Sequence, residues 1–108
     1  MAVSEEYLAY ITEMLEGVGT IQSKCMFGGV LFTVDGNQLG VVLYEELYFK
    51  VVDVTLQQRF RDEGSEQFSY TRKDKKEPVV IKNWWKVPER YLDDPVAIQS
   101  LAEEILRQ

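Results

Sequence analysis

Apolar residues recur every three to four positions in parts of the chain, which is the spacing of an amphipathic helix. The first such stretch follows Ser4, a residue type that caps helices, and stops near Gly17. The second begins at Asp53 or at Thr55, since both are capping residue types, and ends at Gly64. The pattern therefore predicts two helices on either side of a long central region.

A third helix is predicted near the end of the sequence. Asp94 is a capping residue type, and Pro95 suits the first helical position because its fixed backbone angle matches the helix. Pro88, shortly before it, favours a short helical turn. The apolar residues of the three predicted helices are Tyr7, Leu8, Ile11 and Leu15, then Leu56 and Phe60, then Ile98, Leu101, Ala102 and Ile105.

Between the helices the pattern changes to that of β-strands. The segment Asp35-Gly36-Asn37 lies between two apolar runs and predicts a hairpin turn. Short connections join consecutive strands, so we expect antiparallel pairing. The fold class is α+β, an antiparallel sheet with flanking helices in the order α-β-β-β-α-β-β-α. The predicted strands are residues 30–34, 39–43, 47–51, 67–71 and 79–82, the last running toward Trp84 and Trp85.

The predicted sheet is apolar on both faces. Leu31 and Thr33 share one face of their strand, opposite the more apolar face of Val30, Phe32 and Val34. Tyr48 lies on the second face of its own strand together with Lys50. Helices cover one face of such a sheet, and the other meets the remaining helix or a second subunit. The sequence leaves this choice open, and the surplus of apolar surface favours an interaction role.

The composition is that of one soluble globular domain, which we expect to span residues 1–108. The chain has no histidine and one cysteine, so triads with a catalytic histidine, an internal disulfide and a cysteine-rich zinc site are excluded. The absence of a basic N-terminus, of a long apolar run and of a disulfide favours a cytoplasmic protein. The formal net charge of -6 counts against nucleic acid and anionic membranes as partners.

The most distinctive local string runs from Cys25 through Met26, Phe27, Gly28 and Gly29. Paired glycines expose backbone N–H groups to an anion, and a cysteine can be a nucleophile, but neither interpretation has support in the neighbouring residues. We expect instead that the glycines permit a bulge or a close backbone approach and that Met26 and Phe27 pack inside. We also expect Cys25 to be a packed, inert thiol.

Basic and aromatic residues gather in the second half of the chain. They are typical of a surface that binds nucleic acid, of a solvated hairpin tip or of a protein docking site, and the interspersed Asp74 and Glu77 argue against the first. Of the adjacent tryptophans, one belongs to the core and the other to a rim or interface. The candidate interaction surface comprises Tyr48, Tyr70, Arg72, Lys73, Lys75, Lys76, Trp84 and Trp85.

Taken together, these features resemble the N-terminal domain of the TfoX/Sxy family, named for regulators of bacterial competence. The resemblance covers about residues 4 to 107 and treats the chain as a lone domain. Each motif is weak alone, and their order and spacing make the match specific. The matching residues are Lys24, Met26, Phe27, Gly28, Gly29, Asp35-Gly36, Leu47-Tyr48-Phe49-Lys50, Gly64, Phe68, Tyr70, Trp84, Trp85, Pro88-Glu89 and Asp93-Asp94-Pro95.

The resemblance implies a secretion-chaperone-like arrangement and a role in the expression of DNA-uptake genes through a partner regulator. It implies no catalytic, cofactor-binding or metal-binding residue, and we expect no cofactor. Our leading hypothesis is a cytoplasmic protein-interaction module that is not an enzyme, with a homodimer left open. The alternative is a small-molecule-binding domain or an enzyme that uses carboxylates and tyrosines. Direct binding to duplex DNA is not expected.

Overall fold

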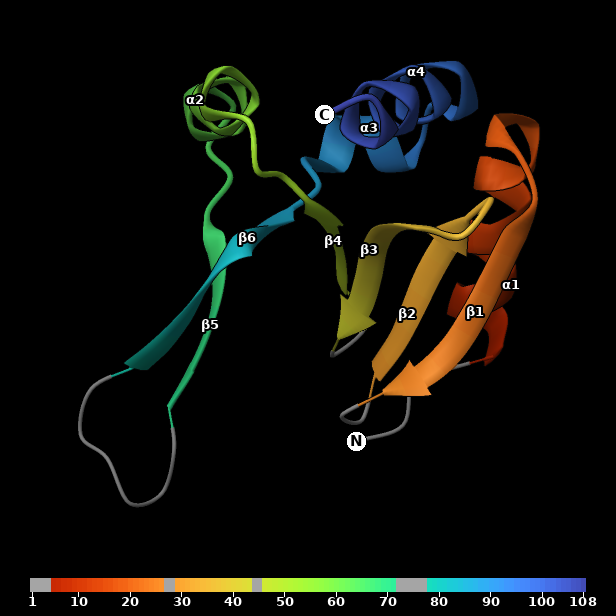
Figure 1. The fold of residues 1–108 in the computed structure, drawn as a ribbon, viewed down its shortest axis with the longest axis horizontal. Coiled ribbons are helices and arrows are strands. Elements are labelled where there is room, and N and C mark those ends of the chain that lie inside the picture. Colours follow the sequence, from red (N-terminus) through yellow and green to blue (C-terminus); the bar gives the residue numbers. More distant parts are fainter. Residues whose placement is uncertain (1–4, 27–28, 44–45, 72–77) are drawn as a thin grey trace.

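The computed structural model describes residues 5–26, 29–43, 46–71 and 78–108, and of residues 26, 70, 71 and 78–82 only the backbone. Consecutive antiparallel strands are grouped together and flanked by helices, as in an α+β fold, which confirms the predicted class (Figure 1). In chain order the elements are α1 (Glu5–Leu15), the 3-10 helix η1 (Glu16–Val18), β1 (Ile21–Met26), β2 (Gly29–Val34), β3 (Asn37–Leu43), β4 (Glu46–Lys50), α2 (Val54–Asp62), β5 (Gln67–Thr71), β6 (Pro78–Lys86), α3 (Glu89–Leu92) and α4 (Pro95–Leu106).

The strands form one six-stranded antiparallel sheet in the order β1-β2-β3-β4-β6-β5. The predicted turn between β2 and β3 is confirmed, and both Asp35 (φ 51°) and Gly36 (φ 86°) have positive φ there. The pair β5 and β6 extends as a long hairpin away from the helices (Figure 1). The sheet therefore consists of a compact part, β1 to β4, and a projecting arm.

The predicted order of elements lacked one strand, β1, and described α3 only as a helical turn. Strand β1 is an edge strand paired with β2 alone, and its residues from Gln22 to Cys25 are exposed. Apolar and polar residues alternate where one face of a strand is buried, and here side chains on both faces are exposed. The apolar pattern therefore carried no signal for it.

The predicted helix start at Asp94 is confirmed, and of the two predicted starts of α2 the structure has Asp53. The Asp94 carboxylate accepts a hydrogen bond from the Ala97 backbone N–H at 3.1 Å. The Asp53 carboxylate accepts one from the Leu56 N–H, also at 3.1 Å, so the cap of α2 is Asp53 and not Thr55. Each bond satisfies one backbone donor that the first turn of a helix leaves without a partner.

Replacing Asp94 with alanine should reduce the free energy of unfolding by about 1 kcal/mol, because the first turn of α4 loses its cap. The neighbouring Asp93→Ala should change it by less than about 0.5 kcal/mol, since Asp93 is exposed and caps no helix start. Chemical denaturation of both variants measures the difference. Equal losses would contradict the capping role of Asp94.

The main hydrophobic core lies between the helices and one face of the sheet. Apolar residues of all four α-helices pack against alternating strand residues that share this face. Across the sheet, Phe32, Gly40, Phe49 and Trp85 are register partners on four neighbouring strands. The buried residues of this core are Ile11, Met14, Leu15, Val30, Phe32, Val34, Leu39, Val42, Leu47, Phe49, Val51, Leu56, Phe60, Trp85, Val87, Tyr91, Ile98, Leu101, Ala102 and Ile105.

Gly29, in the Met-Phe-Gly-Gly motif, permits a close approach of two strands, as predicted. A Cβ atom at this position would lie 2.4 Å from the Val42 carbonyl oxygen and 2.5 Å from Cδ2 of Leu43. Gly29 is not among the glycines with positive φ, so its role is steric. Phe27 and Gly28 lie outside the described residues, as does the side chain of Met26.

The prediction that Cys25 is packed is wrong. Cys25 is exposed on the edge strand β1, which the apolar pattern did not predict. Cys25 pairs with Val30 of β2, which is the neighbour of β1 in the part of the chain that the structure describes.

A thiol reagent should therefore label Cys25 in the folded protein nearly as fast as in the unfolded protein, within about tenfold, because access does not require unfolding. Mass spectrometry at short reaction times, with and without denaturant, measures both rates. Labelling that occurs only after denaturation would contradict the exposed position of Cys25.

Candidate interaction surface

A second, smaller hydrophobic cluster lies on the sheet face that points away from the main core. Leu31, Val41 and Tyr48 are buried at its centre, and the half-buried Leu43, Phe68 and Trp84 pack against them. We call these six residues the second-face cluster. No residue of a described helix belongs to it, in contrast to the main core, which all four α-helices supply.

Strand register explains why these side chains share one face. Leu31 pairs with Val41, and Val41 pairs with Tyr48, so the centre of the cluster runs straight across β2, β3 and β4. Directly paired residues point to the same side of an antiparallel sheet. The residues of this row each precede or follow by one position a residue of the Phe32–Phe49 row, so the two rows lie on opposite faces of the sheet.

Aromatic side chains bring the projecting β5–β6 arm into the cluster. The Phe68 ring meets the Tyr48 ring edge-on, with centroids 5.2 Å apart and planes at 77°. Trp84 is the register partner of Lys50 and lies on this face too. Leu43, Phe68 and Trp84 retain accessible surface, so they form the part of the cluster that a partner can touch.

A small polar network borders the cluster where β4 meets β6. The Tyr48 hydroxyl donates to the Glu46 carboxylate at 3.0 Å, and the other Glu46 oxygen lies 3.0 Å from Nζ of Lys86. The bond to Lys86 lowers the pKa of Glu46, and the same contact raises the pKa of Lys86. Burial raises the pKa of Tyr48, and the bond to Glu46 adds to the effect. Tyr48 therefore stays protonated at neutral pH and acts as a hydrogen-bond donor.

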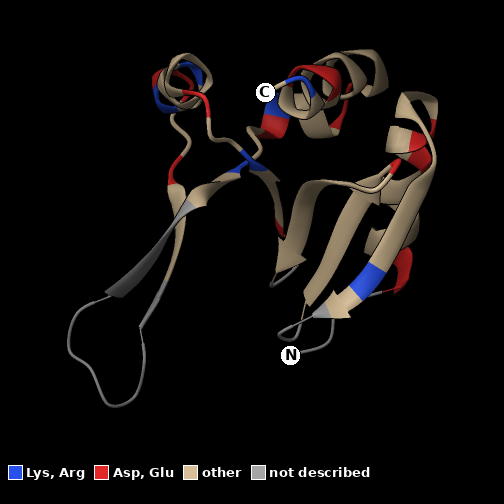
Figure 2. Cartoon of the chain, in the orientation of Figure 1, with Lys and Arg blue, Asp and Glu red and all other residues tan. Residues whose placement is uncertain are grey.

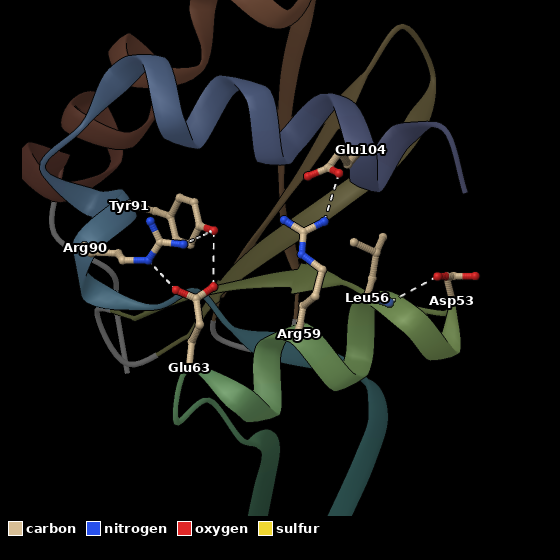
Figure 3. Close-up of polar contacts among 7 residues, drawn as sticks. All are labelled: Asp53, Leu56, Arg59, Glu63, Arg90, Tyr91 and Glu104. Carbon is tan, nitrogen blue, oxygen red and sulfur yellow. Dashed lines mark hydrogen bonds and ion pairs between the residues drawn. The ribbon is translucent and has the colours of Figure 1, made fainter.

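A group of polar contacts outside this face joins the helices to one another (Figure 3). Glu63, at the end of α2, accepts hydrogen bonds from the Arg90 guanidinium and, at 3.2 Å, from the Tyr91 hydroxyl. The bond from Arg90 lowers the pKa of Glu63, while burial raises the pKa of Tyr91. Arg59 of α2 lies 2.9 Å from Glu104 of α4. These contacts fix α2 against α3 and α4 and leave the acid and base groups paired.

A hollow of about 350 Å³ lies between α2 and α4. Gln108 closes one side: its amide oxygen accepts from the N–H groups of Val52 and Asp53, and its amide nitrogen donates to the carbonyls of Lys50 and Ile105. Among the described residues, no cluster of carboxylates and cysteine suited to a metal ion occurs. The residues that line the hollow are Asp53, Thr55, Leu56, Arg59, Glu104, Arg107 and Gln108.

Comparison with protein families assigns the chain. The family model of the TfoX N-terminal domain matches residues 13–108, which is most of the sequence. The chain belongs to this family. The TfoX N-terminal domain family is not a known family of enzymes. A search among curated proteins gave no match.

The structure brings together two of the aromatic residues that the sequence of this TfoX N-terminal domain suggested as a surface. Tyr48 and Trp84 both belong to the second-face cluster. Trp85 does not: it is 2% exposed in the main core, because it pairs with Phe49 on the helix-facing side. The prediction that one tryptophan is core is confirmed, and Trp85 is removed from the surface. Tyr70 lies on β5 with its side chain outside the described part, and Arg72, Lys73, Lys75 and Lys76 lie outside the described residues.

Sequence reasoning did not connect Phe68, Leu43 or the Glu46–Lys86 pair to this surface. Phe68 reaches Tyr48 because β5 lies beyond β6, which in turn pairs with β4. That order joins segments far apart in the chain, and local patterns carry no information about it. The alternation in β4, which places Tyr48 on the second face with Glu46 two residues earlier, was the available signal.

No described helix of this TfoX N-terminal domain is both long and apolar enough to cross a lipid bilayer.

Proposed function

We propose that this TfoX N-terminal domain is a cytoplasmic protein-interaction module that binds its partner through the second-face cluster. The proposal takes the chain as a single domain, residues 1–108, without catalytic activity. A finer part of it, supported by the family, is that the partner is a transcription regulator and that the complex controls genes for DNA uptake.

The observation that carries the proposal is that the second face of the sheet is apolar and aromatic and that no helix of the described residues contributes to it. The helix-facing side of the same sheet buries its apolar residues under α1, α2, α3 and α4. On the second face, Phe68 and Trp84 remain half-buried, and aromatic residues with partly exposed rings are enriched in the centres of protein interfaces. The carboxylate that borders the cluster, Glu46, is paired with Lys86 at 3.0 Å, which is typical of a structural ion pair.

The alternative, a small-molecule-binding domain, is favoured by one observation, the hollow between α2 and α4. Its volume lies at the lower end of the range of about 300–1,000 Å³ for ligand sites. Six of the seven residues that line it are polar or charged, and Arg59 and Glu104 already neutralise each other. Ligand sites are mainly apolar with a few convergent polar groups, so the second-face cluster is the better-supported site.

The test is affinity capture from the native cytosol with the wild-type chain and two aspartate variants. Trp84→Asp places a charge in the second-face cluster, whereas Val96→Asp places the same charge on α4, where Val96 is 79% exposed. A specific partner should be captured by the wild type and by Val96→Asp, and lost with Trp84→Asp. Circular dichroism and thermal melting confirm that each variant is folded.

Equal capture by both variants would contradict the proposal. If Trp84→Asp unfolds the chain, Trp84→Ala replaces it, with weaker capture by about tenfold as the expected result. Transcript levels of DNA-uptake genes in cells that carry the Trp84 variant test the regulatory part separately.

A further inference from the structure

The second-face cluster carries its own charge pattern, which differs from that of the whole chain. Register places Lys24, Lys50 and Lys86 on this face, as partners of Leu31, Trp84 and Tyr48. Strands β2 and β3 between them carry no charged residue. The acidic segments lie mainly on the helices, on the other side of the sheet (Figure 2). A chain with a net charge of -6 thus presents lysines around its apolar second face.

These lysines differ in whether they form an ion pair with a carboxylate. Lys86 is paired with Glu46 at 3.0 Å, and Glu66 is close enough to add to the negative potential around Lys86. Lys50 donates to the neutral amide of Gln38 at 3.1 Å, and Lys24 is exposed. Within the described ranges neither of these two lysines forms an ion pair. The uncompensated positive charge of the face therefore sits at Lys24 and Lys50.

The sheet geometry sets the spacing of these two charges. Lys24 lies in the register row of Tyr48, three strands away, and Lys50 lies two residues beyond Tyr48. Strand spacings of about 4.8 Å and about 3.4 Å per residue place the two Cα atoms about 16 Å apart. Residues about eleven positions apart in an α-helix are separated by the same distance and lie on the same side, since three turns have passed. A helix is also the element that normally covers an apolar sheet face.

We propose that the second-face cluster docks an amphipathic helix of a partner protein, with apolar residues between two acidic residues about three turns apart that meet Lys24 and Lys50. This rests on the proposed function and adds the chemistry of the partner. Charge complementarity of this kind selects partners and speeds their association. Between the two lysines the helix lies over Leu31 and Val41, and beside Lys50 it reaches Trp84, so that apolar contact supplies affinity.

The experiment measures fluorescence anisotropy with labelled helical peptides of about sixteen residues. The acidic peptide has two glutamates about eleven positions apart, with leucine and phenylalanine between them on the same side and neutral residues elsewhere. Its twin has lysines in place of the two glutamates. At about 50 mM salt the wild type should bind the acidic peptide at least about tenfold more tightly than the twin.

Variants of the chain then reverse the charges. In the double variant Lys24→Glu and Lys50→Glu the preference should invert, so that the lysine twin binds better. The matched control Arg107→Glu removes a positive charge from the end of α4 and should keep the wild-type preference. Thermal melting shows whether the variants are folded. If the double charge reversal unfolds the chain, the double variant Lys24→Gln and Lys50→Gln replaces it and should abolish the preference.

Several results would overturn this inference. One is that the acidic peptide does not bind at about 1 mM, and another is that the preference survives charge reversal. A dimer of the chain in light scattering that competes with the peptide would also overturn it, as would binding of single-stranded DNA that depends on Lys24 and Lys50. The proposed function fails separately. If capture of a partner requires Trp84 but does not change when Lys24 and Lys50 are replaced, the proposed pairing with acidic residues is wrong and the second-face cluster remains the interaction surface.

Discussion

Replacing Trp85 with alanine should reduce the free energy of unfolding by about 3–5 kcal/mol, the range for removal of a large aromatic side chain from a core. The Trp85 ring is 2% exposed and lies edge-on to Phe60, with centroids 6.5 Å apart. The Arg61 guanidinium stands 5.0 Å from its centroid, so a cation–π contact is lost as well. Urea denaturation followed by circular dichroism measures the loss.

The neighbouring Trp84 is the matched control, because it has the same side chain at the next position of β6. It is half-buried on the second face, so Trp84→Ala should cost only about 1 kcal/mol while weakening partner capture. Trp85→Ala and Trp84→Ala therefore separate stability from binding. Equal losses of stability would contradict the assignment of the two tryptophans to opposite faces.

Gly40→Ala should have the second large effect, a loss of about 3 kcal/mol or more, because the added methyl group has no space. A Cβ atom at Gly40 would lie 2.2 Å from the Tyr48 carbonyl oxygen and 2.9 Å from Cδ1 of Phe49. Gly40 sits in register between Phe32 and Phe49, and its lack of a side chain leaves room for both rings. Thermal and chemical denaturation measure the loss.

Gly36→Ala provides the contrast to Gly40→Ala. Nothing lies within 4 Å of a Cβ atom at Gly36, so the cost comes from its positive φ alone and should be about 1 kcal/mol. A Gly40→Ala variant as stable as Gly36→Ala would contradict the close approach of β3 and β4 at this point.

Local signals in the sequence predicted most of the elements. Asp94 followed by Pro95 marks a helix start through a cap and a preset backbone angle, and both act within one turn of the chain. The Asp35-Gly36 turn acts equally locally. The caps did not distinguish Asp53 from Thr55 as the start of α2, since both residue types satisfy the same backbone donors.

Features that depend on distant strands were beyond local patterns. Strand β1 shows no alternation of apolar and polar residues, because its residues from Gln22 to Cys25 are exposed. The strand was therefore not predicted, and the expectation that Cys25 is packed was wrong. The candidate surface was predicted in part. Alternation along a strand places Tyr48 and Trp84 each on one face of its own strand, but it does not show which strands are neighbours in the sheet. The pairing of β4 with β6 decides that Trp84 faces the second cluster and Trp85 the core.

Methyl NMR spectroscopy of the chain bound to its captured partner tests the central claim most directly, that the second-face cluster is the interaction surface. Leu31, Val41 and Leu43 report on this face, and the exposed Val54 and Val96 report on the helices. We predict that the methyl signals of Leu31, Val41 and Leu43 shift on binding while those of Val54 and Val96 do not. Shifts confined to Val54 and Val96 would contradict it.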